Sequence, residues 1–386
     1  MPRSPLYASL CTMLALSLCL SGCEKPSPTT DNTQNNAPPL ANAPSLSPEH
    51  TQAMFDAGTA ALNEAQASAA ALQKAVTGLL QTPTEQALKT AQQAWLIAAT
   101  DYRRFHLARH IGLVEPTLFS RLNRLDYQIS GHPIQPGFLD TFGAYKYSGL
   151  VHDIGFPITQ ESLSHQHGLT DLSDVVLGYY AIEFMLFNQG TARNVDDFKA
   201  VASLDSGLKE RGFEKLEEVP HNRRRALLET QATLLLSDLQ TLNTLWQGDS
   251  ANAAHKEWRS LNVKKHIDII HAATASALTQ CMIEIGELNQ NDEHEHQRLS
   301  PHIYAASFAQ QQQFIHNALA SIHSAVPMLI NANQPNIEKA LAHAVRLTEK
   351  TALAETETLT EHWRDVFTAV KDASDFLGTP PAQSPQ

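Results

Sequence analysis

Residues 175–187 read VVLGYYAIEFMLF. On a helix this run is apolar on every face, which is typical of a helix buried in a core rather than of an amphipathic surface helix. It contains one carboxylate, Glu183, and Tyr180 lies one turn earlier on the same stripe. Because an unpaired carboxylate costs several kcal/mol to remove from water, we expect Glu183 to have a partner. That partner is a cation, an arginine such as Arg109 or a set of hydrogen-bond donors.

Helical signals continue on both sides of this run. The motifs SPE at 47–49 and TPTE at 82–85 combine a capping residue, a proline and an early acid, and they predict two helix starts. The second of these helices is expected to run to about His110. Apolar residues after Pro220, and again over 359–370, alternate steps of three and four. No alternating β-branched run stands out, so the sequence predicts an all-α fold.

Prolines and glycines concentrate between residues 112 and 171. A long irregular stretch inside a compact domain is usually functional. A second weakly patterned zone, 188–219, separates two helical regions. We therefore expect two packed four-helix-bundle-like halves, about 47–200 and about 220–377, with the irregular segment in the first half and a short tail at 378–386.

The N-terminus has the pattern of a bacterial lipoprotein. Residues 1–22 form a short apolar signal peptide that ends in Leu-Ser-Gly before Cys23. A lipidated Cys23 would anchor the protein to a membrane, because each buried methylene contributes about 0.8 kcal/mol. Residues 23–46 have the composition of a disordered tether. We expect a periplasmic lipoprotein, and Glu24 after the cysteine favours the outer membrane in a Gram-negative cell.

The charge and the histidine content limit the possible partners. The net charge is -12 and there is no long basic run, which argues against nucleic acid. The chain has 18 histidines, all of them after the tether, so metal ions stay among the candidate ligands.

The sequence GYYAIEFMLF at 178–187 resembles the G-x-H-x-x-E-F-L-L-W signature of imelysin-like proteins. Further family elements resemble the segments at 94–96 (AWL), 132–133 (HP), 156–159 (FPIT), 223–225 (RRR) and 286–288 (GEL). The order and spacing match over nearly the whole domain at 47–377. The resemblance implies two fused four-helix bundles around an interior site. It also implies a periplasmic or surface protein linked to iron uptake, in a family of which some members are classed as metallopeptidases.

One departure from the family pattern affects which metal ion the site would prefer. Tyr180 occupies the position of the family's metal-ligand histidine. A phenol is a poor zinc ligand because its ordinary pKa is near 10, whereas ferric iron stabilises a phenolate, so the pair with Glu183 favours iron, or no metal, over zinc. His106, where the family's second helix carries a carboxylate, could rebuild a site with Glu183. The predicted metal-binding residues are Glu183, Tyr180 and His106, and the predicted ligand-binding residues are Arg109, Gly178 and His302.

These observations predict a lipid-anchored periplasmic protein that binds a ligand or iron during iron uptake, with a transporter or receptor as partner. No catalytic residue is assigned, and an active peptidase is not expected. Two alternatives stay open. One is a zinc-dependent metallopeptidase in which His106 replaces the lost histidine, and the other is a non-catalytic scaffold or interaction lipoprotein.

Overall fold

The computed structural model describes residues 47–188, 192–248, 253–289, 306–329, 333–350, 352–354 and 357–378. Within these ranges every regular element is a helix, and extended backbone pairs only at an isolated bridge between Phe142 and Tyr145. The all-α prediction is confirmed. In the same ranges no helix is long and apolar enough to cross a bilayer. Cys23 and His302 lie outside the described residues, as do the predicted signal peptide and tether.

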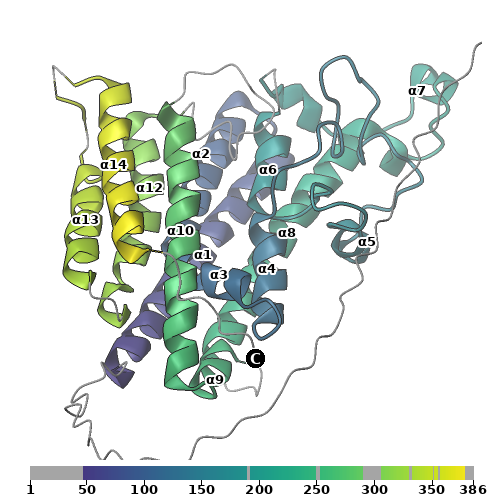
Figure 1. Cartoon of the computed structure of the whole chain (residues 1–386). Helices are drawn as coiled ribbons and strands as arrows, with labels where there is room; N and C mark the ends of the chain where they lie inside the picture. The colour runs from purple at the N-terminus through teal and green to yellow at the C-terminus, as the bar shows by residue number, and fades with distance from the viewer. Residues whose placement is uncertain are drawn as a thin grey trace, which may run out of the picture. The chain divides into compact units, whose positions relative to one another are not determined.

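The run that opened the sequence analysis forms helix α6, which belongs to a group of five helices. Helix α1 packs against α2 and α8, and α6 packs between the same two helices. Helix α4 contacts both α6 and α8, and Figure 1 shows this group in purple to teal. The bounds are α1 (Pro48–Gln81), α2 (Glu85–Tyr102), α4 (Ser120–Ser130), α6 (Gly178–Phe187) and α8 (Pro220–Gln247).

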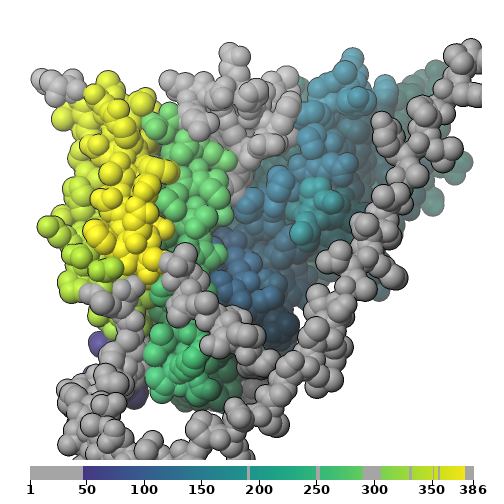
Figure 2. All heavy atoms as spheres, viewed as in Figure 1, coloured from purple at the N-terminus to yellow at the C-terminus, as the bar shows by residue number. Residues whose placement is uncertain are grey.

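The C-terminal helices form a second group. Helix α14 packs against α10 and α13, and α12 packs against the same two helices. The surfaces of α10 (green) and α14 (yellow) adjoin in Figure 2. The bounds are α10 (Val263–Asn289), α12 (Phe308–His323), α13 (Gln334–Leu347) and α14 (Leu359–Leu377). The predicted boundary between two halves, near residues 200–220, stays a prediction.

Short helices connect and flank these groups. Helix α3 packs against α4 of the first group and against α10 and α12 of the second, and so lies where the two groups meet. The short elements are η1 (Arg103–Phe105), α3 (His106–Val114), α5 (Gln160–Gln166), η2 (Val195–Phe198), α7 (Ser206–Glu210), η3 (Leu216–Glu218), α9 (Ala254–Arg259) and η4 (Val326–Met328).

The prediction of one helix from residue 85 to about His110 was wrong, because the helix breaks at η1. Two side chains of α12 bind the backbone on either side of the break. Asn317 donates to the Thr100 carbonyl at 2.9 Å, and Ser321 Oγ accepts from the Leu107 amide at 3.0 Å. In a continuous helix the Leu107 amide would bond within the helix, so Ser321 supplies the partner that the break removes, whereas the Thr100 carbonyl also accepts from the Arg103 amide.

Helix α8 fixes part of the irregular segment through Arg223. This side chain is largely buried and donates to successive carbonyls of the loop at 2.6–3.0 Å. One guanidinium thereby satisfies carbonyls that would otherwise lose their partners on leaving water. The accepting residues are Leu150, Val151, Asp153 and Phe156.

A buried carboxylate, Asp140, ties the same segment to two further arginines. Its Oδ2 lies 2.6 Å from Arg224 Nε and 3.1 Å from Arg193 Nη1. His152 Nε2 lies 3.5 Å from its other oxygen. Burial acts to raise the pKa of Asp140, but His152 and the two guanidiniums outweigh it and hold that pKa below its ordinary value. Asp140 is therefore ionised at neutral pH.

Candidate functional site

Helix α6 is held in place through its backbone. Trp95 of α2 donates its indole N–H to the Tyr179 carbonyl at 2.7 Å. Gln231 of α8 donates to the carbonyl of Val176 at 2.9 Å. These donors are side chains of two different helices, α2 and α8. The position of α6 is therefore fixed by hydrogen bonds on two sides.

Gly178, the first residue of α6, meets the end of α4. Its φ is +84°, and a Cβ at this position would lie 2.4 Å from the carbonyl oxygen of Ile129 and 2.5 Å from that of Gln128. Only glycine allows this conformation and this approach together. The structure therefore gives Gly178 a role in backbone packing that joins α4 to α6.

Glu183 is buried, as the sequence predicts, with 3% of its surface exposed. Tyr180 is partly buried on the preceding turn. Burial raises the pKa of the Tyr180 phenol, Arg103 and Arg109 act to lower it, and Glu284 and Glu183 act to raise it. The phenol thus shares one electrostatic environment with two guanidiniums and two carboxylates.

The structure pairs Arg109 with Asp126. Arg109 Nε lies 2.9 Å from Asp126 Oδ1, and its Nη2 donates to Oδ2 at 3.1 Å. Tyr102 also donates its hydroxyl to Asp126, at 2.9 Å. Asp126 was missed in the sequence, where Arg109 was one of the alternative partners considered for Glu183. Its only local signal is an acid on the apolar stripe of α4, next to Leu125 and Ile129.

A second buried ion pair joins Arg103 of η1 to Glu284 of α10, with both side chains no more than 5% exposed. Gln280 donates to Glu284 at 3.0 Å, and the guanidinium of Arg103 lies 4.5 Å from the centroid of the Phe314 ring. This pair was also missed in the sequence. We call the buried charged groups around Tyr180 the α6 cluster: Arg103, Arg109, Asp126, Glu183 and Glu284.

His106 faces α10. Its Nε2 lies 3.3 Å from the Ala277 carbonyl and 3.7 Å from Cys281 Sγ, and its Nδ1 has no hydrogen-bond partner. The His110 ring is 4.6 Å away. Burial, with Arg103, lowers the pKa of His106 well below its ordinary value, and burial, with Arg109, lowers the pKa of His110 to about 2. Both imidazoles are therefore neutral at pH 7 and offer lone pairs.

Among the residues that the structure describes, no three His, Cys, Asp or Glu side chains are grouped closely enough to hold a metal ion. A phenol such as Tyr180 is not one of these four types. The predicted metal-binding residues Glu183, Tyr180 and His106 therefore stay a prediction, as does the ligand-binding role of His302, which lies outside the described ranges.

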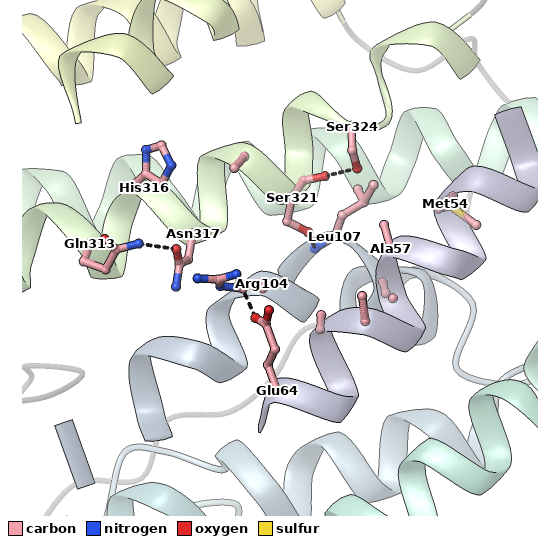
Figure 3. Close-up of a pocket in the computed structure, with 15 residues that line it drawn as sticks. Met54, Ala57, Glu64, Arg104, Leu107, Gln313, His316, Asn317, Ser321 and Ser324 are labelled. Carbon is pink, nitrogen blue, oxygen red and sulfur yellow. Dashed lines mark hydrogen bonds and ion pairs between the residues drawn. The ribbon is translucent and has the colours of Figure 1, made fainter. Parts of the chain in front are cut away.

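A groove lies on the other side of the η1–α3 segment, between α1 and α12 (Figure 3). It encloses about 360 Å³. At one end Arg104 pairs with Glu64 at 2.7 Å, near Gln313, whereas Leu107 and Met54 lie toward the other end. Small side chains of α1 and α12 leave the space open: Ala57, Gly58, Ala60, Ala61, Ala320, Ser321 and Ser324. The sequence analysis did not predict this groove.

Comparison with known proteins gives a family match and a fold match. The model of the imelysin family, labelled peptidase M75, matches residues 58–375. No curated protein matches the chain significantly. Two solved structures have the same fold. One, a candidate iron-regulated protein A precursor from Parabacteroides distasonis, is 15% identical with a TM-score of 0.54, covering 87% of this chain and 95% of that one. The other, an imelysin-like protein from Psychrobacter arcticum, is 16% identical with a TM-score of 0.53, covering 86% and 92%.

Proposed function

Because the chain belongs to the imelysin family, we propose that it is a lipid-anchored periplasmic protein that binds iron during iron uptake and is not an active peptidase. The iron link is supported by the name of the similar structure from Parabacteroides distasonis. The lipid on Cys23, the outer-membrane location and a transporter or receptor partner belong to the same proposal and rest on the sequence pattern.

The observation that supports the proposal is the set of oxygen donors around α6. Glu183 is buried, and the Tyr180 phenol lies one turn earlier within its electrostatic reach. The buried carboxylates of Asp126 and Glu284 belong to the same α6 cluster. A cation bound among such oxygens would offset the cost of removing their negative charge from water.

The donor types suit ferric iron better than zinc. Tyr180 and Glu183 offer hard oxygen donors, which match a hard trivalent ion. Burial raises the pKa of the Tyr180 phenol despite the nearby guanidiniums of Arg103 and Arg109, so ferric iron would have to displace the phenol proton when it binds. When bound, ferric iron would supply the positive charge that burial of these groups requires. A zinc peptidase would use the imidazole that Tyr180 replaces, so this site favours binding over hydrolysis.

We expect the protein, purified without a metal-affinity column, to bind Fe(III) supplied as the citrate complex and to show a visible phenolate-to-iron band. Tyr180→Phe should abolish the band and weaken Fe(III) binding by at least about 100-fold, because changes outside the ligand shell alone cost about 10–100-fold. Bound iron is measured by elemental analysis and the band by absorption spectroscopy.

Tyr147→Phe is the matched control, because this phenol is 76% exposed and should leave both readings unchanged. A wild-type protein that takes up no iron and shows no band would rule out the iron-binding function. Zinc-dependent cleavage of a peptide library would establish the peptidase alternative in its place.

The groove supports a second candidate function, and we infer that it binds a small amphiphilic organic molecule. The pair Arg104–Glu64 lies at one end with the polar side chains of α12, and Leu107, Met54 and small side chains line the remainder. The polar side chains are Gln313, His316 and Asn317. Pockets of this size with a few polar groups at one end are typical of small-molecule sites. Arg104 and Leu107 line the groove, whereas Arg103 and His106 on the same segment face α10, so the groove is separate from the α6 cluster.

Anilinonaphthalene sulfonate, an anionic amphiphile, tests this function. Ala60 is an exposed residue of the groove, and Ala60→Trp should fill it and weaken dye binding by at least about tenfold. Ala53→Trp, at an exposed position of α1 outside the groove, is the control. Equal dye fluorescence titrations for the two variants would show that the groove is not the binding site.

A further inference from the structure

His132 is brought next to Tyr180 by the junction of two helices. It follows the end of α4 by two residues, and α4 meets the first residue of α6 at Gly178. The His132 and Tyr180 ring centroids are 4.9 Å apart, with the ring planes at 57°. The two residues are 48 positions apart in the sequence, but the junction of α4 and α6 makes their rings direct neighbours.

The orientation of His132 leaves one nitrogen available. Its Nδ1 lies 2.9 Å from the Ser130 carbonyl oxygen, which can only accept, so Nδ1 carries the proton and Nε2 keeps its lone pair. An imidazole that donates one N–H to a backbone carbonyl and keeps its other nitrogen for the metal is the usual arrangement of a metal-binding histidine.

His132 also shares its electrostatic environment with Tyr180. Glu284 and Arg109 act on the pKa values of both residues. Both groups therefore border the α6 cluster, where the proposed iron would be attracted. His106, by comparison, directs its Nε2 toward Ala277 and Cys281 of α10.

We propose that His132 supplies the nitrogen ligand of the iron site formed with Tyr180 and Glu183, in place of the imidazole that the signature helix lacks. This inference rests on the proposed iron-binding function. It assigns the nitrogen donor to the segment after α4 rather than to the second helix, where the sequence analysis placed it with His106.

The test compares His132→Gln and His106→Gln in the full-length protein loaded with Fe(III) citrate. Electron spin-echo spectroscopy detects an imidazole nitrogen bound to Fe(III), independently of affinity. We expect His132→Gln to lose this nitrogen signal and to bind Fe(III) at least about tenfold more weakly. His106→Gln should keep the signal. His165→Gln, an exposed histidine of the irregular segment, is the control.

The outcomes separate the two proposals. If wild-type protein binds no Fe(III), the proposed function fails. If it binds Fe(III) and His132→Gln keeps the nitrogen signal, only the assignment of His132 fails, and loss of the signal in His106→Gln would move it to that residue. Should His132→Gln unfold, as circular dichroism would show, His132→Asn gives the same comparison, because its shorter side chain retains a polar group at the Ser130 contact.

Discussion

Gly178→Ala is expected to reduce the free energy of unfolding by about 3–5 kcal/mol. Two effects add. The left-handed conformation at φ +84° costs a residue with a Cβ about 1–2 kcal/mol. The Cβ would also lie 2.4 Å from the Ile129 carbonyl oxygen, a backbone atom at the end of α4 that cannot rotate away. The helix junction must therefore open, and such backbone strain is among the few causes of losses this large.

Gly286→Ala provides the matched control. Gly286 lies inside α10, and a Cβ there meets nothing within 4 Å. Alanine at that position should stabilise the protein by about 0.5–1 kcal/mol, since it favours the helix. Urea unfolding followed by circular dichroism measures both variants. If Gly178→Ala unfolded at the wild-type urea concentration, the close junction of α4 and α6 would be disproved.

Local sequence signals predicted the starts of the first two helices, because capping is a short-range interaction. Ser47 accepts from the Glu49 amide and Thr84 from the Ala87 amide, at the two starts that the SPE and TPTE motifs indicated. The break after Tyr102 could not be predicted in this way. The groups that stabilise it, Asn317 and Ser321, are more than 200 positions further along the chain.

For the candidate site as well, local features were predicted from the sequence and long-range contacts were not. Tyr180 and Glu183 were found because they share one stripe of one helix. The partner of Arg103 was not found, because Arg103 on η1 and Glu284 on α10 are 181 positions apart. A single sequence shows which acids lie among apolar neighbours, as Asp126 and Glu284 do, but it does not show which arginine each acid will meet.

Asp140→Asn is expected to cost about 3–5 kcal/mol of folding free energy at pH 7. The substitution keeps the size of the side chain but leaves Arg193 and Arg224 buried without the charge that both contact. Removing one partner of a buried ion pair has an effect of this size, because the remaining charge loses water without compensation. The irregular segment should loosen first, since Asp140 ties it to α8. Urea unfolding measures the loss, and limited proteolysis should detect cleavage between 137 and 157.

The pH dependence of the free energy of unfolding tests the same ion pairs independently. The pKa of Asp140 is lowered in the folded protein, so the stabilisation is complete above the ordinary carboxyl pKa near 3.9 and is lost as the pH falls below it. The difference between wild type and Asp140→Asn should therefore shrink by about 1.4 kcal/mol per pH unit below that value. Asp196→Asn is the control, because its partner Lys199 and Asp196 itself are 61% and 58% exposed, and such pairs contribute at most about 1 kcal/mol. Equal losses for the two variants, or a difference independent of pH, would mean that Asp140 contributes no more than a surface charge.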